Sequence, residues 1–111
     1  MTEHDHQRIV ISTIRRDYPD LLIFAVPNIG TASPQRGARM KAEGVLAGIP
    51  DLMIARAAQG FHGLFVEMKT LTGSASKEQK SVIAKLQAEG YRCEVCKGYA
   101  AALEAIRGYL S

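Results

Sequence analysis

Apolar residues recur along the chain with two different periods, which predict helices and strands in turn. The helical spacing of Val10 and Ile14 places both on one stripe and predicts a helix over residues 3–18, ending before Pro19. The same spacing predicts helices over residues 77–90, closed by a glycine, and 101–110. These three helices separate the strand-like parts of the chain.

Short apolar or alternating runs predict four strands. They cover residues 21–26, 51–56, 64–70 and 91–96. The turn-forming residues between the second and third strands predict an antiparallel hairpin. The third and fourth strands should be parallel, because the helix between them makes a right-handed crossover. The order predicts an α/β fold, a small mixed sheet flanked by helices.

The segment of residues 28–48 has a weak pattern, with several glycines and the basic residues Arg36, Arg39 and Lys41. We expect a loop there, with a helical turn at most over residues 38–43.

Composition and charge narrow the class of protein. At 111 residues, 47% of them hydrophobic and 23% charged, we expect one compact domain, residues 1–111. No apolar run approaches the roughly 18–20 residues of a membrane span, and the start lacks the pattern of a secretory signal, so a cytoplasmic location is expected. The net charge of +3 is compatible with a polyanionic partner but does not require one.

The two cysteines form a Cys-x-x-Cys sequence, Cys93 to Cys96, which raises the possibility of a redox or zinc site. No second pair of ligands at zinc-finger spacing completes a four-ligand zinc site. On the predicted strand, residues three apart point to opposite faces, which does not suit a reactive dithiol. Two buried, small apolar side chains are the simpler interpretation.

Charged residues stand at the ends of the central hairpin. In the third strand Glu67 and Lys69 share a face, and a hairpin places Asp51, at the start of the second strand, near Glu67. A divalent cation such as Mg²⁺ or Mn²⁺ commonly neutralises two close carboxylates. A Glu-x-Lys pair alone is more simply a salt bridge, but Pro50 stiffens the entry to Asp51 and favours a built site.

Two further polar residues lie at the ends of helical stripes. Gln79 precedes the apolar stripe of its helix, and it also completes a Ser-x-x-Gln capping box with Ser76, so a site role and a capping role both remain open. Glu3 and Gln7 continue the stripe of Val10 at the start of the first helix. For Glu3 an exposed N-terminal acid is the simpler interpretation.

The order of elements, together with "GIPD", "LFVEMK" and "SKEQ", resembles the PD-(D/E)xK nuclease superfamily, and more narrowly the stand-alone VRR-NUC domains of phage and bacteria. The resemblance covers nearly the whole chain, although the Val-Arg-Arg string that gives the family its name is absent. It implies a restriction-endonuclease-like α-β-β-β-α-β core. It places Asp51, Glu67 and Lys69 on the catalytic motif, Gln79 on the following helix and Glu3 on the N-terminal acid.

The resemblance implies metal-dependent hydrolysis of phosphodiester bonds in DNA. Mg²⁺ or Mn²⁺ is expected on Asp51, Glu67 and the backbone carbonyl of Met68, with Lys69 orienting the nucleophile. Contacts to the DNA backbone are expected from the loop residues Asn28, Arg36, Arg39 and Lys41. Related stand-alone domains resemble homodimeric enzymes that cut Holliday junctions, so branched DNA and a homodimer are expected.

Two other classes remain open at this point. One is a non-catalytic nucleic-acid-binding module on the same fold, and the other is a small structural or partner-binding domain. Retention of both acids and the lysine favours the enzyme.

Overall fold

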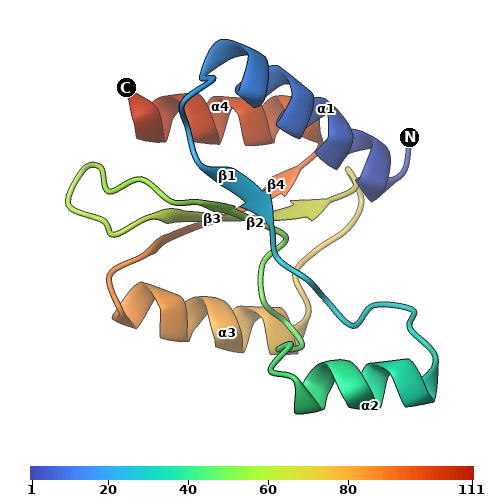
Figure 1. Ribbon diagram of the computed structural model, residues 1–111. Coiled ribbons are helices and arrows are strands. Elements are labelled where there is room, and N and C mark those ends of the chain that lie inside the picture. The colour runs from blue at the N-terminus through green and yellow to red at the C-terminus, as the bar shows by residue number, and fades with distance from the viewer.

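The computed structural model describes residues 1–111 and contains one four-stranded sheet between layers of helices (Figure 1). The elements are α1 (Glu3–Asp17), β1 (Ile23–Ala25), α2 (Pro34–Ala42), β2 (Leu52–Ile54), β3 (Leu64–Lys69), α3 (Lys77–Ala88), β4 (Arg92–Lys97) and α4 (Tyr99–Leu110). Every element predicted from the sequence is present, with ends displaced by at most two residues. The predicted α/β class is confirmed.

The sheet has the strand order β1-β2-β3-β4. β1 pairs antiparallel with β2, β2 pairs antiparallel with β3, and β3 pairs parallel with β4. The predicted hairpin and the predicted parallel crossover are therefore both correct. In this register Leu52 lies opposite Val66, so the chain just before β2 runs beside the C-terminal end of β3.

The main core lies between the sheet and the helices α1 and α4, which cover one face together (Figure 1). Alternate residues of the central strands point into it, and α1 contributes Val10 and Ile14 as predicted. The fully buried Tyr109 of α4 donates a hydrogen bond from its hydroxyl to the carbonyl of Arg56, 2.6 Å away. The polar end of this large core side chain is thereby satisfied.

The opposite face of the sheet carries α3, whose close contacts are with β4. Phe65 and Glu67 of β3 point to this side and are both buried, so β3 is more fully enclosed than simple alternation suggests. Cys96 lies in the main core, whereas Cys93 belongs to the other face. Both thiols are free, and burial raises the pKa of each to about 11, which agrees with packing rather than redox chemistry.

The loop expected over residues 28–48 is wrong in its middle part, because residues 34–42 form the helix α2. Its start carries ordinary helix signals: the hydroxyl of Ser33 accepts a hydrogen bond from the amide of Arg36, and Pro34 occupies the first turn. Gly37 looked like a loop residue in the sequence, but it is the buried position where α2 rests on Ile29. No other helix or strand packs closely on α2, which stands apart from the sheet (Figure 1).

No helix of the structure is both long enough and apolar enough to cross a membrane.

The turn before β2 is fixed by a close approach of two backbones. Gly48 has a φ of +88°, and a Cβ atom placed on it would lie 2.9 Å from the carbonyl oxygen of Glu78 at the start of α3. Only glycine meets both demands without strain. Pro50, fully buried, then leads directly into Asp51.

We predict that Gly48→Ala lowers the free energy of unfolding by about 1–3 kcal/mol, because it combines backbone strain with a backbone clash. Gly44→Ala is the matched control, since Gly44 has a φ of +103° but no atom near its missing Cβ. Chemical denaturation of the two variants measures the difference. Equal destabilisation by both would show that the contact with α3 contributes nothing.

Candidate functional site

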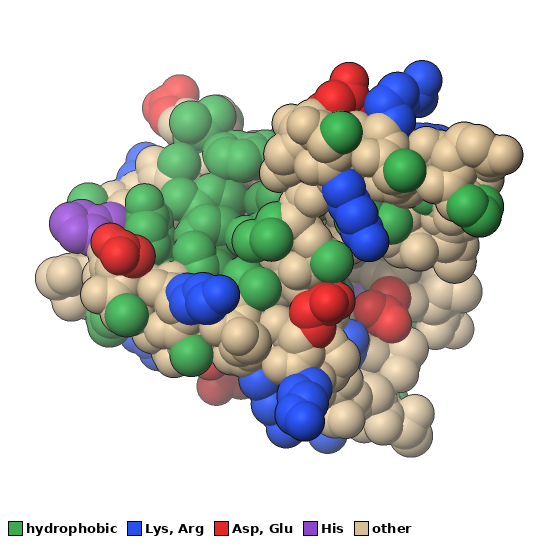
Figure 2. All heavy atoms as spheres, turned by 90° about the horizontal axis from the view of Figure 1, so that it is seen from below, with side chains coloured by type: hydrophobic (Ala, Val, Ile, Leu, Met, Phe, Trp, Pro, Cys, Tyr) green, Lys and Arg blue, Asp and Glu red, His purple; other side chains and the backbone are tan.

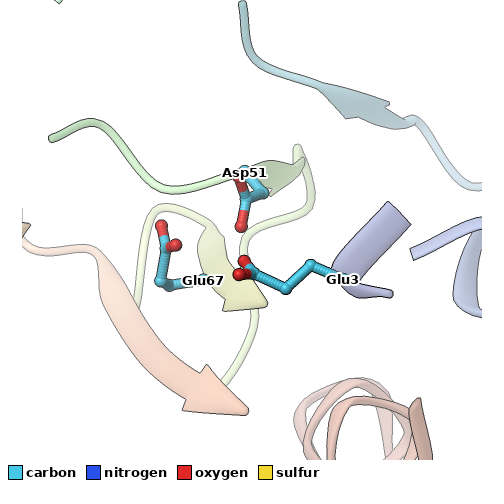
Figure 3. A group of neighbouring side chains, drawn as sticks. All are labelled: Glu3, Asp51 and Glu67. Carbon is cyan, nitrogen blue, oxygen red and sulfur yellow. The ribbon is translucent and has the colours of Figure 1, made fainter. Parts of the chain in front are cut away.

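Three carboxylates from distant parts of the chain meet beside the C-terminal half of β3. One oxygen each of Glu3, Asp51 and Glu67 lies within 4.8 Å of the others. Figure 3 shows that Glu3 reaches in from the start of α1, Asp51 from the entry to β2, and Glu67 from β3. Their surroundings differ, because Glu3 is exposed, Asp51 is half-buried and Glu67 is only 2% exposed.

Asp51 is held against β3 by a short hydrogen bond. The amide of Met68 donates to Asp51 Oδ2 at 2.7 Å, at a point on β3 that lies beyond the end of β2. On the other side the carbonyl of Asp51 accepts from the amide of Val26 at 2.8 Å. Both the side chain and the backbone of Asp51 are therefore fixed by neighbouring strands.

Glu67 is a buried acid with one paired and one unpaired oxygen. Its Oε2 accepts a hydrogen bond from Gln79 Nε2 at 2.9 Å and lies 3.7 Å from Lys69 Nζ. Its Oε1 is buried and has no hydrogen-bond partner. Burial raises the pKa of the Glu67 carboxyl to about 8, and the Asp51 carboxylate adds to the rise while the Lys69 ammonium opposes it.

Gln79 has both of the roles that its sequence position left open. Its Oε1 accepts from the amide of Ser76 at 2.8 Å, and the Ser76 hydroxyl accepts from the Gln79 amide at 3.1 Å, which forms a complete capping box. Its Nε2 remains free of the cap and donates to Glu67. One amide side chain thus joins the start of α3 to the acid on β3.

Glu3 reaches the cluster because the start of α1 is attached to α4. Thr2 and Asp5 cap α1 reciprocally, at 2.8 and 3.2 Å. One turn on, His6 Nδ1 accepts a hydrogen bond from the amide of Tyr99 at 2.9 Å, and the two rings stack. This contact holds the first turn of α1 beside the end of β4, so Glu3 is close to the other acids rather than being only a solvated terminal residue.

The carboxylates line a cleft of about 560 Å³ between α1, the segment after β1, α2 and the start of α3. Of the residues predicted for a site, the cleft contains Glu3, Asn28, Arg36, Asp51, Glu67, Lys69 and Gln79. Arg39 and Lys41 do not line it and are exposed elsewhere on α2. Of the three basic residues on α2, Arg36 therefore lines the cleft, whereas Arg39 and Lys41 lie on the outer surface of the helix.

Asn28 uses its side chain to shape the wall of this cleft. Its Oδ1 accepts from the amide of Ile29 at 2.8 Å, and its Nδ2 donates to the carbonyl of Ile49 at 3.3 Å. These bonds join the segment after β1 to the turn that carries Asp51.

His4 and Thr31 also line the cleft, and sequence analysis did not select them. Gln7, noted only for its place on the stripe of Glu3, lines it too. The sequence gives one indication of these residues: His4 directly follows Glu3, and Gln7 lies one helical turn after Glu3. This indication is useful only when the start of the helix is known to reach the site.

The donor set suits a hard divalent cation. Three carboxylates offer oxygen ligands, and the unpartnered Glu67 Oε1 gives a buried acceptor that a cation would satisfy. Lys69 is mostly buried, with 14% of its side chain exposed, and supplies a positive charge beside the acids. The site therefore combines a cluster of three carboxylates with a lysine ammonium group in one cleft.

Comparison with known proteins identifies the family of the chain. The family model described as "VRR-NUC domain" matches residues 1–100. A solved structure titled "VRR_NUC domain protein" is 32% identical to this chain, with a TM-score of 0.82, and the alignment covers 99% of this chain and 88% of the other. No curated protein matches significantly. The chain therefore belongs to the VRR-NUC family of nuclease-type domains.

Proposed function

We propose that residues 1–111 act as one Mg²⁺- or Mn²⁺-dependent DNA endonuclease domain. The observation that carries the proposal is the buried Glu67, which lies in a cluster with Asp51 and Glu3 and has one oxygen, Oε1, without a hydrogen-bond partner. A buried carboxylate beside other carboxylates is costly unless a proton or a cation neutralises it, and a cation can bind the oxygens of all three acids together. Membership of a nuclease-type family supports a catalytic cation over a purely structural one.

Asp51 and Glu67 are the proposed metal ligands, with the backbone carbonyl of Met68 as a third. Support for Met68 comes from strand geometry, because the N–H and C=O of one residue point to the same neighbouring strand. The Met68 amide points to Asp51, so its carbonyl faces that side of β3 as well. Glu3 supports the metal or its water from α1.

When bound, the cation lowers the pKa of water and stabilises charge on the scissile phosphate. Lys69 orients the attacking water or the phosphate, since its ammonium is fixed beside the acids. Gln79 keeps Glu67 in place through the 2.9 Å hydrogen bond.

DNA is the proposed substrate, with its backbone held by Arg36 at the cleft and by Arg39 and Lys41 on α2. Asn28 supports DNA binding indirectly, because its hydrogen bonds to Ile29 and Ile49 hold the wall of the cleft. We further propose branched DNA, such as a Holliday junction, as the preferred form and a homodimer as the active unit. Two symmetric sites suit two symmetric strands.

Cleavage of a panel of DNA substrates tests the activity. With Mg²⁺ or Mn²⁺, we expect cutting of four-way junctions or flaps in preference to single strands and linear duplex. Asp51→Ala and Lys69→Ala should each lower the rate by at least about 100-fold, since each removes a group at the reacting phosphate.

Circular dichroism of both variants is the control for folding. A fully active Asp51→Ala would contradict the metal assignment. DNA binding without cleavage of any substrate, with metal present, would instead identify a non-catalytic binding module.

Gln79 and Ser76 offer a matched pair for the role of the amide. Ser76→Ala and Gln79→Ala each remove one of the two hydrogen bonds of the capping box, the first at a cost of about 1 kcal/mol, but only Gln79→Ala removes the hydrogen bond to Glu67. We expect Mn²⁺ affinity, measured by calorimetry, to fall about 10-fold or more in Gln79→Ala and to change little in Ser76→Ala. Equal losses would reduce Gln79 to a capping residue.

The raised pKa of Glu67 predicts a pH dependence of metal binding. Below about pH 8 the metal-free protein holds a proton on Glu67, and a cation must displace it. Affinity for Mn²⁺ should therefore rise with pH, by up to about 10-fold per unit, and level off above about pH 8. Calorimetry in buffers of different ionisation enthalpy should detect the released proton. An affinity that is constant between pH 6 and 8 would contradict this account of Glu67.

A further inference from the structure

Two lysines stand side by side at the C-terminal ends of the parallel strands. Lys69 of β3 and Lys97 of β4 are register partners, so their side chains lie on the same face of the sheet, on strands about 5 Å apart. Lys69 is paired with Glu67 at 3.7 Å, whereas Lys97 is exposed and forms no ion pair. Like charges at opposite positions of neighbouring strands repel each other, so an anion beside Lys97 is favoured.

An exposed group of large side chains follows Lys97 directly. Leu71, in the turn after β3, is 73% exposed, and Tyr99, the first residue of α4, is 39% exposed. The Tyr99 ring stacks on His6, with 5.5 Å between the ring centroids and 27° between the planes. Gly98 brings these side chains together, because a Cβ atom placed on it would lie 3.4 Å from Leu71 Cδ2 and 3.5 Å from His6 Cε1. We call His6, Leu71 and Tyr99 the rim group.

Backbone hydrogen bonds fix the rim group to the site. The amide of Gly98 donates to the carbonyl of Lys69 at 2.9 Å, and the amide of Tyr99 donates to His6 Nδ1, also at 2.9 Å. The exposed side chains therefore stand on a frame that is tied to the lysine of the acidic cleft. A surface that is already in place binds a ligand without the cost of ordering a loop.

From these observations we infer that the ends of β3 and β4 form a subsite for one DNA nucleotide next to the reacting phosphate. Lys97 binds the phosphate of this nucleotide, and Leu71 and Tyr99 pack against its base. Such packing needs a base that is not stacked in a duplex, as at a branch point. The inference deepens the proposed function and rests on it, because it names the feature of the DNA that the site selects.

The distribution of basic residues agrees with this position of the DNA. Figure 2, which views the molecule from the side of α3, shows Lys and Arg side chains on both sides of the acidic side chains near its centre. Arg36 lines the cleft on the side of α2, and Lys97 lies beyond Lys69 on the side of β4. A DNA backbone that crosses the acids would therefore meet a cation before and after the reacting phosphate.

A nucleotide suits the rim group better than a protein partner does. A standard protein interface takes about 20–30 residues on each side, whereas the rim group has three side chains. An apolar protein surface would also leave the ammonium group of Lys97 without a counter-charge. A nucleotide supplies both parts, since its base has a flat face for an aromatic ring and its phosphate neutralises the lysine.

The test is binding of a DNA fork with unpaired arms and of a linear duplex of the same length, both in EDTA so that no cleavage occurs. We expect the wild type to bind the fork at least about 10-fold more tightly. Leu71→Ala and Tyr99→Ala should each lower this preference at least about 5-fold, whereas Leu71→Phe should keep it, because a phenyl ring also packs on a base. Circular dichroism checks the fold of each variant.

Lys97→Ala should weaken binding of both DNAs and reduce the salt dependence by about one phosphate contact. Lys85→Ala is its matched control, since Lys85 is also exposed but lies in the last turn of α3, and it should change neither. An unchanged preference in both Leu71→Ala and Tyr99→Ala, or equal effects of the two lysine variants, would overturn the inference. A wild type that prefers the fork but cuts no DNA with metal present would contradict the proposed function and leave the subsite standing, whereas cleavage with no preference for the fork would do the reverse.

Discussion

The burial of Glu67 beside Asp51 is the constraint on which the site depends. A carboxylate that is 2% exposed loses most of its hydration, and a second carboxylate close by makes its charge still less favourable. The protein compensates only in part, with one amide from Gln79 and a lysine 3.7 Å away, and leaves Glu67 Oε1 without a partner. The charged form of Glu67 is therefore unfavourable in this arrangement, and either a proton or a bound cation would neutralise it.

The fold produces this crowding through simple geometry. β2 begins at Leu52, which lies opposite Val66, so β3 continues past the start of β2. The amide of Met68 therefore donates its hydrogen bond to the side chain of Asp51. The turn at Gly48, pressed against the start of α3, sets where Asp51 enters, and the same helix start carries Gln79. The place where β2, β3 and the start of α3 meet thus positions Asp51, Glu67 and the Gln79 amide that donates to Glu67.

Local patterns in the sequence were sufficient for the sheet and for the centre of the site. The hairpin that brings Asp51 near Glu67 depends on neighbouring residues and is found as expected. The capping box at Ser76 was one of two open roles for Gln79, and the structure shows both. The helix α2 was missed because Gly37 suggested a loop, whereas its buried contact with Ile29 depends on tertiary packing. The approach of Glu3 likewise depends on the contact of His6 with Tyr99, residues 93 positions apart, which no local pattern shows.

The metal assignment is the central claim, and a crystal structure with Mn²⁺ tests it most directly. Anomalous scattering measured at the manganese edge locates the ion independently of any activity. We predict a peak within coordination distance of carboxylate oxygens of Asp51 and Glu67, on the side of β3 that faces the Met68 carbonyl. Saturating Mn²⁺ with no peak between these acids, or with ions only at other surface acids, would contradict the account.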